Sequence, residues 1–360
     1  MRTILARPIA VAALGALLLV PCARAAVSQY APISLPADAG VHANAHSEWW
    51  YFTGHLRDHA GHRYGYELTT FKFSGVKGMI PLQFSDTVYR IDFAITDESR
   101  HTFRSMIAYL PVTPGRTSLP AGTLHSAMKA DSGTMSIDTL PGPGLAYRLR
   151  GSMGAGSLDL TLRTTRPPLL EGQGGVEQIA NGYSYYYSLT NMQSSGSLGT
   201  VAGRQRVDGV TWMDHQWGNW DWRQDKGWDW LSVQLSNGTS LALTNFTDAR
   251  GASYKYASVS KPEGGQLGTP NAFMIRDGRS WNSPLTHTTF PQGWKVRVPA
   301  IGLVATVVPT LSNQEMVDRF GIASYWEGSC RLVGTLRGKP VTGTAYVELV
   351  GYGKGRPVNI

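Results

Sequence analysis

Acidic, imidazole and indole side chains are interleaved in the stretch GVTWMDHQWGNWDWRQDKGWDW, residues 209–230. Six of the 11 tryptophans lie in it, on either side of Asp214 and His215. A carboxyl group packed against indole rings has its charged form disfavoured, so it can stay protonated near neutral pH and act as a general acid. Because indole faces also stabilise a cation, the pattern suits protonation of an alkene and stabilisation of the resulting carbocation. The same pattern also suits a tryptophan-rich strand and loop that join two domains, with Asp214 and His215 hydrogen-bonded to the backbone.

A second stretch, HSEWWYFTGHL (residues 46–56), places an acid beside a row of aromatic side chains. Glu48 is either an acid of a site or the partner of an arginine that closes a barrel. In a strand, consecutive side chains point to opposite faces, so at most one of Trp49 and Trp50 lines a given cavity.

Other site chemistries find little support in the sequence. His55, His59 and His62 are spaced like metal ligands, but the last two flank a predicted turn and no cysteine or carboxylate set completes a zinc pattern. No G-x-S-x-G motif, phosphate-binding loop or dinucleotide fingerprint occurs in a suitable context. We therefore expect no metal and no cofactor.

The elements that must position these residues are predicted to be short strands. Alternating residues predict hairpins over 49–74, 228–248 and 324–352, with turns at DHAG, NG and RGKP. Gly makes up 41 of the 360 residues, and helical periodicity is almost absent after the first 25. This predicts an all-β protein that is long enough for two domains. We place an N-terminal domain at residues 30–218 and a C-terminal domain at residues 219–360.

The first 25 residues are predicted to be a signal peptide, because two arginines precede a short apolar run and an Ala-Arg-Ala cleavage site follows it. We expect cleavage after Ala25 and a periplasmic or secreted protein whose mature chain has no transmembrane span. Acylation of Cys22 would make it a lipoprotein, but Pro21 argues against this. Cys330 is then the one cysteine left, so no internal disulfide forms.

The charge of the chain favours no nucleic-acid partner. The formal net charge of +8 falls to +5 once the three arginines of the signal peptide are removed. The remaining Lys and Arg residues are scattered, with no run of four or more.

Three stretches in this order resemble one family: SEWWYFTGHL, GVTWMDHQWG and YWEG…GKPVTGTAYVELVGY. The sequence resembles the carotenoid 1,2-hydratase family, also called the hydroxyneurosporene synthase or CrtC/AttH-like family, over essentially the whole mature chain. The resemblance implies two tandem lipocalin-like antiparallel β-barrel domains. Characterised members of that family add water to an isoprenoid double bond without a cofactor, and fungal relatives catalyse cycloadditions in a pocket between the two domains. Some exported bacterial members resemble components encoded beside membrane export transporters.

The resemblance carries over to only a few residues. The family's His-x-Trp element matches His215 and Trp217, preceded by Asp214, and its EWWY element matches residues 48–51. The Tyr-x-Asp pair that carotenoid enzymes use further along the chain has no counterpart in SLALTNF, residues 240–246. A different proton donor, such as Asp214, or a different reaction is therefore expected.

Our first hypothesis is an exported, cofactor-independent, hydratase-like lyase that acts at a C=C bond of an apolar isoprenoid or lipid-like substrate. Asp214 would be the general acid, and His215 would orient it or the water. The catalytic candidates are Asp214, His215, Trp217 and Glu48, and the substrate-binding candidates are Trp49, Tyr51, Trp212, Tyr187 and Trp326. The alternative is a non-catalytic periplasmic carrier of an apolar ligand that works with an ABC-type export transporter, and a secreted hydrolase is a third hypothesis. An unpaired acid facing the cavity would favour the enzyme, because a carrier needs no protonated carboxyl.

Overall fold

The computed structural model describes residues 30–75, 87–111, 125–130, 133–179, 182–220, 225–318 and 324–353. The expected signal peptide and its cleavage site lie outside the described residues. Residues Pro32–Ile360 form one compact unit. Its described part consists of strands, turns and two short 3-10 helices, η2 (Ala37–Ala39) and η4 (Pro299–Ile301), so the all-β prediction is confirmed.

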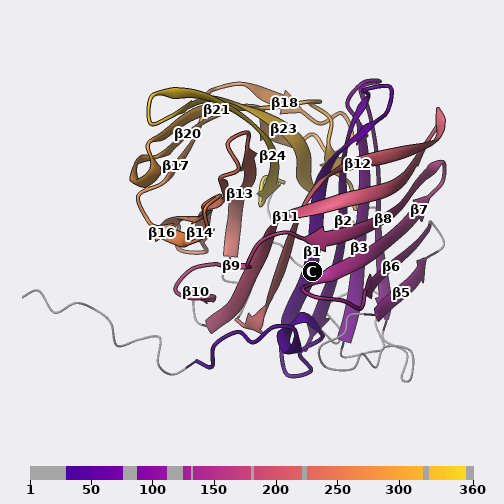
Figure 1. Ribbon diagram of the computed structural model, residues 1–360, viewed down its shortest axis with the longest axis horizontal. Helices are drawn as coiled ribbons and strands as arrows, with labels where there is room; N and C mark the ends of the chain where they lie inside the picture. Colours follow the sequence, from indigo (N-terminus) through magenta and orange to yellow (C-terminus); the bar gives the residue numbers. More distant parts are fainter. Residues whose placement is uncertain are drawn as a thin grey trace, which may run out of the picture. The chain divides into compact units, whose positions relative to one another are not determined.

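The first sheet is antiparallel, with the strand order β4-β3-β2-β1-β12-β11-β8-β7-β6-β5; β9 and β10 also pair with β11. Its strands are β1 (Ser47–Asp58), β2 (Arg63–Ser74), β3 (Thr87–Asp97), β4 (Thr102–Pro111), β5 (His125–Ala130), β6 (Gly133–Thr139), β7 (Ala146–Met153), β8 (Gly156–Thr164), β9 (Leu169–Leu170), β10 (Val176–Ile179), β11 (Gly182–Thr200) and β12 (Gly203–Asn219). The end strands β4 and β5 contact each other, so the sheet curls into a nearly closed, lipocalin-like barrel (Figure 1).

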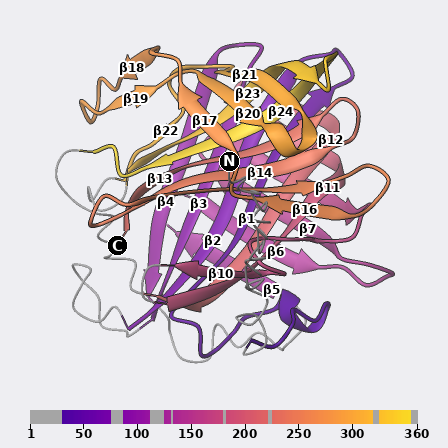
Figure 2. The ribbon, with the colours of Figure 1, turned by 90° about the vertical axis from the view of Figure 1, so that its left-hand side faces the viewer.

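The second sheet has the order β16-β15-β14-β13-β24-β23-β21-β20-β17, and β22 also pairs with β23. Its strands are β13 (Asp225–Leu235), β14 (Ser240–Asp248), β15 (Ser253–Ser260), β16 (Gln266–Thr269), β17 (Phe273–Arg276), β20 (Trp294–Val298), β21 (Leu303–Pro309), β22 (Glu315–Met316), β23 (Tyr325–Leu336) and β24 (Lys339–Val350). A separate hairpin pairs β18 (Ser280–Asn282) with β19 (Thr289–Pro291). Because β17 contacts β14, this sheet also curls on itself, as the orange and yellow strands of Figure 2 show.

The alternation along β1 explains how the first sheet acquires an apolar interior. Trp50, Phe52 and Leu56 are buried inside the curled sheet. Trp49 and Tyr51 lie on the other face, in a separate aromatic cluster. The prediction that the two tryptophans face opposite sides is therefore confirmed. Each fully buried side chain of this size contributes roughly 1.5–3 kcal/mol through removal of apolar surface from water.

The outer face of the first sheet packs against the second sheet, with β2 on β23 and β1 on β24. Hydrogen bonds cross this junction: the Tyr325 hydroxyl donates to Asp92 Oδ2 at 2.6 Å, and the Ser329 hydroxyl donates to Glu98 Oε1 at 2.7 Å. We call the side chains between the two sheets the intersheet layer. The side chains of the intersheet layer come from the outward faces of β1–β3, β11 and β12 in the first sheet. In the second sheet they come from the faces of β13, β23 and β24 that are turned toward the first sheet.

The predicted hairpins form at the predicted turns. β1 pairs with β2, β13 with β14, and β23 with β24. In the last hairpin Arg337 and Gly338 have φ values of 51° and 77°. Positive φ at both central residues is the requirement of a type I′ turn, whose twist matches that of the flanking strands.

The chain passes from the first sheet to the second between Asn219, the end of β12, and Asp225, the start of β13. Both sheets belong to the single compact unit Pro32–Ile360. The division into two domains at Gly218 therefore stays a prediction, which a test of independent folding would decide.

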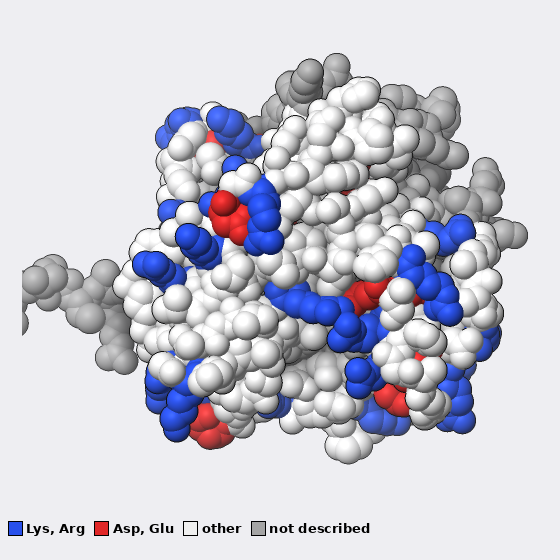
Figure 3. Space-filling model, turned by 90° about the horizontal axis from the view of Figure 1, so that it is seen from above, with Lys and Arg blue, Asp and Glu red and all other residues white. Residues whose placement is uncertain are grey.

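Charged side chains are dispersed over the face of the molecule that is seen from above. On the face that Figure 3 shows, Lys and Arg occur singly or in small groups, with Asp and Glu among them. Within the described ranges, no helix has the length and apolar character that crossing a membrane requires.

Candidate active site

Strand β12 separates the predicted site residues into two groups, because consecutive residues of a strand point to opposite faces. His215 and Trp217 point into the curled first sheet, where Trp217 belongs to the apolar core. Trp212 and Asp214 point into the intersheet layer. His215 therefore does not orient Asp214, and the two side chains belong to different sites.

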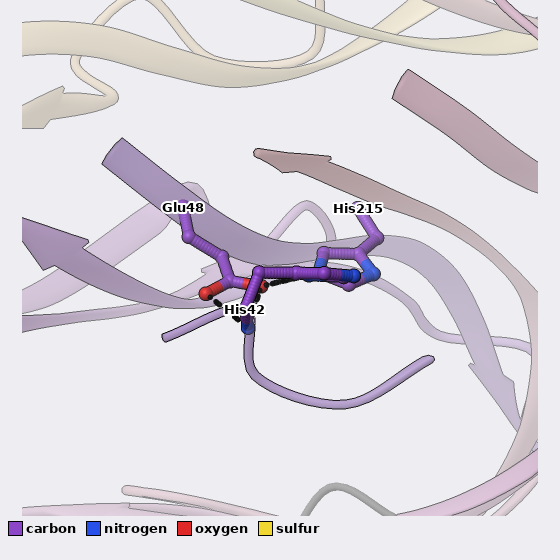
Figure 4. Close-up of side chains that lie close together, drawn as sticks. All are labelled: His42, Glu48 and His215. Carbon is purple, nitrogen blue, oxygen red and sulfur yellow. Dashed lines mark hydrogen bonds and ion pairs between the residues drawn. The ribbon is translucent and has the colours of Figure 1, made fainter. Parts of the chain in front are cut away.

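The first group surrounds the carboxylate of Glu48, inside the first sheet (Figure 4). His42, which precedes β1, places its Nδ1 atom 2.7 Å from Glu48 Oε1, and His215 from β12 places its Nε2 atom 3.1 Å from the same oxygen. The His42 backbone N–H donates to both carboxylate oxygens at 3.0 Å. The rings are held by stacking: His42 lies 4.1 Å from Trp217 and His215 lies 4.7 Å from Trp50, measured between centroids.

The electrostatics of this group favour an ionised Glu48. Burial raises the pKa of Glu48, but hydrogen bonds from His215 and His42 outweigh it, so the pKa is lowered overall. Burial lowers the pKa of His215, so this ring is neutral and donates from Nε2 to the carboxylate. The Lys72 ammonium lies 3.6 Å from Glu48 Oε2. Among the described residues, Glu48 thus pairs with two histidines and a lysine and with no arginine.

His42, Glu48 and His215 also offer the ligand types of a metal site, since their ligand atoms all lie within 4.8 Å of one another. Two histidines and a carboxylate can bind zinc or iron. However, the hydrogen bonds and the lysine above already saturate both oxygens of Glu48. The group is complete as an ion-paired hydrogen-bond network, so its geometry does not require a metal.

The second group surrounds Asp214 in the intersheet layer. Asp214 is 3 % exposed. Trp212 Nε1 and the Ser188 hydroxyl donate to Asp214 Oδ1 at 2.6 and 2.5 Å, and the Tyr186 hydroxyl donates to Oδ2 at 2.7 Å. Burial raises the pKa of Asp214 to about 7, although these three donors offset part of the rise. Asp214 therefore has the pKa expected of a group that exchanges protons near neutral pH.

A second buried acid, Glu171, shares the Ser188 hydroxyl with Asp214. Glu171 follows β9, and its Oε1 atom lies 2.9 Å from Ser188 Oγ. Burial, followed by the charge of Asp214, raises the pKa of Glu171 to about 8. Sequence analysis missed this residue because only the pairing of β9 with β11 brings it to Asp214. Its position in the loop sequence LLEGQGG gave no signal of burial.

Aromatic contacts connect Asp214 to the opposite end of the intersheet layer. Trp212, which donates to Asp214, packs edge-on against Trp230, with ring centroids 6.2 Å apart. Trp230 in turn meets the Tyr51 ring at 5.4 Å, and the Tyr51 hydroxyl donates to Glu327 Oε1 at 2.8 Å. The layer thus has an aromatic middle with an acid at each end.

The other predicted substrate-binding residues are divided among three environments. Trp49 belongs to the aromatic cluster of the intersheet layer. Tyr187 lies inside the first sheet, with its hydroxyl 3.4 Å from His215 Nδ1. Trp326 belongs to the core of the second sheet and donates from Nε1 to the Ser312 carbonyl at 2.9 Å. The structure therefore brings Tyr51, Trp49 and Trp212 together but places Tyr187 and Trp326 elsewhere.

The fold and the acidic layer between its sheets define a class of protein: two lipocalin-like antiparallel sheets joined by buried carboxyl groups. The profile of the AttH-like family matches residues 26–352, and the chain belongs to this family.

Relatives share the fold and part of the sequence. The chain is 25 % identical over 209 residues to kievitone hydratase of Fusarium solani subsp. phaseoli and 26 % identical over 210 residues to dehydratase asqC of Emericella nidulans. These alignments cover 54 % of this chain and 57 % and 58 % of the two relatives, so the chain spans little more than half the length of the relatives it matches.

The similarity to solved structures extends over more of the chain than these two sequence alignments do. An AttH candidate from Nitrosomonas europaea superposes with a TM-score of 0.74 at 25 % identity, over 89 % of this chain and 98 % of its own. Kievitone hydratase from Nectria haematococca superposes with a TM-score of 0.70 at 19 % identity, over 88 % and 91 %. These similarities confirm the lipocalin-like fold class.

Proposed function

We propose that this protein is a cofactor-independent hydratase-like lyase, which adds water to a C=C bond or removes it, with Glu171 and Asp214 as the proton-exchanging pair. The observation that carries the proposal is the hydroxyl of Ser188, which lies within hydrogen-bond distance of both carboxyl groups. The names of the relatives kievitone hydratase and dehydratase asqC support the same reaction class.

A single hydroxyl hydrogen cannot serve two carboxylates. Ser188 is closer to Asp214 Oδ1, at 2.5 Å, than to Glu171 Oε1, at 2.9 Å. If Ser188 donates to Asp214, the second contact is attractive only when Glu171 is protonated and donates to Ser188 Oγ. The pair then holds one proton at neutral pH, on the acid with the higher pKa, which is the state that acid–base catalysis needs.

The pair Glu171 and Asp214 can supply and take back every proton that moves during hydration. The Glu171 proton moves to Ser188 Oγ while the Ser188 proton moves to Asp214, and Asp214 then protonates one alkene carbon. The carbocation left on the other carbon is attacked by water, and the water returns its extra proton to Glu171 through the Ser188 hydroxyl. One C–H and one C–O bond form, one water is consumed, and both acids return to their starting states; dehydration is the reverse sequence.

The aromatic rings in the middle of the intersheet layer would stabilise the positive charge that develops on the carbocation. The indole faces of Trp212 and Trp230 and the ring of Tyr51 are buried near Asp214, and such faces attract a cation most strongly away from water. A tertiary carbocation of an isoprenoid or lipid-like molecule is the species that these rings would stabilise. We therefore propose an apolar or partly apolar substrate.

Export is a second part of the proposal, supported by the amino-terminal sequence. The protein would be cleaved after Ala25 and would act in the periplasm or outside the cell. Intact mass spectrometry of the protein from its native envelope tests this directly: a chain that begins at Ala26 supports export, and a chain that retains residues 1–25 contradicts it.

The test of the reaction uses protein purified from its own envelope, with co-purified small molecules extracted and identified. Incubation of these molecules with wild-type protein in H₂¹⁸O should yield a product that has gained labelled water, or a substrate that has lost water. Glu171→Gln and Asp214→Asn should bind the same molecules without converting them. Glu315→Gln is the control, because Glu315 is a buried acid of the second sheet that bonds Ser283 and Thr286, away from the layer. A ligand that wild type leaves unchanged would instead identify the protein as a carrier, for which an ABC-type export transporter is the partner to seek.

A further inference from the structure

The end of the intersheet layer opposite Asp214 contains polar atoms whose hydrogen bonds are missing. Glu67 of β2 is 0 % exposed, and neither of its carboxyl oxygens has a well-formed hydrogen bond to a described residue. Glu327 of β23 is also 0 % exposed; its Oε1 atom accepts from Tyr51, but its Oε2 atom has no partner among the described residues. An unsatisfied buried polar group costs about 1–3 kcal/mol, so such a set requires an explanation.

Further unpartnered groups come from the same strands. Thr53 of β1 stands opposite Glu67 in the sheet register, and Thr69 is the next residue on the same face of β2. Within the described part of the chain, the hydroxyl oxygens of both threonines lack a well-formed hydrogen bond, as does that of Tyr346 on β24, although Thr69 interacts with Glu67 and Tyr346 with Thr96. Several buried polar atoms are thus gathered at one place, and none of them has a well-formed hydrogen bond to a described residue.

Gly65 shows that these groups from the two sheets face one another. It lies two residues before Glu67, on the same face of β2. A Cβ atom at Gly65 would meet Ser329 Cβ at 2.7 Å and the Tyr346 hydroxyl at 3.2 Å. The strands therefore approach closely beside Glu67, which points between the sheets toward β23 and β24.

Charge at this place favours a neutral ligand. The nearby Arg90 is committed to Asp92 through two hydrogen bonds, from Nε at 2.7 Å and from Nη2 at 2.5 Å. Among the described residues, no Lys or Arg forms an ion pair with Glu67 or Glu327. Burial, with the charge of Asp92 for Glu67 and of Glu348 for Glu327, raises the pKa of each carboxyl well above its usual range. Both groups are then protonated, and each can donate as well as accept.

We infer that Glu67 and Glu327, with Tyr346, form a second binding subsite, which holds a neutral hydroxyl or carbonyl oxygen of the same molecule that reacts at Asp214. This inference rests on the proposed function. The chain of contacts from Glu327 through Tyr51, Trp230 and Trp212 to Asp214 connects the two subsites. The substrate is therefore amphiphilic: an oxygen function at one end, an apolar body along the rings, and the reacting C=C bond or hydroxyl at the other end.

Two probes that differ by one hydroxyl test the inference: 4-(3-methylbut-2-enyl)phenol and (3-methylbut-2-enyl)benzene. Calorimetric titration of the wild type should give a dissociation constant about tenfold lower for the phenol, the effect of one buried hydrogen bond. Glu67→Met should bring the two constants together, whereas Glu67→Gln, whose amide also donates and accepts, should keep most of the difference. Glu315→Gln should leave the ratio unchanged.

Several results would overturn the subsite. Equal affinities of the wild type for the two probes would mean that ordered water alone satisfies Glu67. Failure of the wild type to bind either probe would also contradict the subsite. If the ratio of the two dissociation constants stays the same in Glu67→Met, the phenol hydroxyl binds at another place. Tighter binding of 4-(3-methylbut-2-enyl)benzylamine than of the phenol would identify an anionic site for cations instead.

The same probes separate this inference from the proposed function, because incorporation of ¹⁸O from labelled water reports the reaction independently. A phenol preference that depends on Glu67, without ¹⁸O incorporation into either probe, would keep the subsite and contradict the hydratase. Incorporation of ¹⁸O into both probes, with no dependence of affinity on Glu67, would keep the hydratase and contradict the subsite.

Discussion

At the scale of single residues, the chemistry proposed for the intersheet layer depends on one serine hydroxyl. Ser188 cannot donate to Glu171 and Asp214 at once, so the two acids share a proton. The pKa values of about 8 and about 7 belong to interacting groups and describe the pair as a unit.

The activity should therefore follow a bell-shaped pH profile. Below about pH 7 Asp214 becomes protonated and cannot accept a proton, and above about pH 8 Glu171 loses the proton that it must donate. Glu171→Gln should lower kcat/KM roughly 10²–10⁴-fold and remove the alkaline limb of the profile. A profile of kcat/KM between pH 5 and 10 checks this, and an alkaline limb that persists in the variant would exclude Glu171 as the acid.

Inside the first sheet, Glu48 should act on stability. Glu48→Gln removes the negative charge that faces the buried Lys72 ammonium and weakens the bonds to His42 and His215. Loss of one partner of a buried pair costs about 3–5 kcal/mol, so the free energy of unfolding should fall by that order. Urea denaturation measures it. Lys72→Met in the same chain should recover part of the loss, and a purely additive double variant would show that the two groups are not coupled.

At the scale of elements, the close approach of β2 to β23 limits what the junction tolerates. Gly65 leaves space for Ser329 and the Tyr346 hydroxyl, and a Cβ atom there would be in conflict with the Ser329 side chain. The contact explains why a glycine stands near the start of β2, an inner strand of the first sheet, where it would otherwise weaken the strand.

Gly65→Ala should destabilise the protein by about 1–3 kcal/mol, because overpacking forces the two strands apart. The thermal midpoint measures the effect. Gly353→Ala is the matched control, since the nearest atom to a Cβ there is Thr288 Oγ1 at 3.9 Å. Equal thermal midpoints for Gly65→Ala and Gly353→Ala would mean that the two sheets can move apart at Gly65 without a loss of stability.

At the scale of the whole molecule, buried acids of two kinds set the pH range of stability. Burial raises the folded pKa of Asp214 and Glu171, so their contribution is complete below about pH 4 and is lost as the pH rises through about 7 and about 8. Glu98 behaves oppositely. Burial raises its pKa, but His55, Ser329 and Arg331 outweigh this and lower the pKa to about 2, so its contribution is present above about pH 4.5 and is lost as the pH falls toward 2.

We therefore expect the free energy of unfolding to be greatest near pH 4 and to decline above it by about 1.4 kcal/mol per pH unit for each raised acid, until the pH reaches the folded pKa of that acid. Denaturant titrations from pH 3 to 9 check the curve. Glu171→Gln should flatten the alkaline decline, and Glu98→Gln should flatten the acid decline. A stability that rises steadily from pH 5 to 9 would contradict the buried, protonated acids.

Local patterns in the sequence were sufficient for much of the fold. Alternation along residues 47–74 specified a hairpin and the opposite faces of Trp49 and Trp50, and the RGKP turn is the one observed. The same alternation also applied to Asp214 and His215, and it could have shown that adjacent residues of a strand do not act on one substrate. An alternation with a period of two can be recognised from a few consecutive residues, because the face to which a side chain points depends only on its position in its own strand.

Only the tertiary structure decided which face became which site. The first sheet encloses Glu48, His42 and His215 because it curls, and the outward face of β12 becomes the proposed reaction site because a second sheet covers it. Glu171 reaches Asp214 across 43 positions of sequence through the pairing of β9 with β11. Burial, and with it the raised pKa values of these acids, arises only when distant strands exclude water together, and a local sequence pattern does not contain that information.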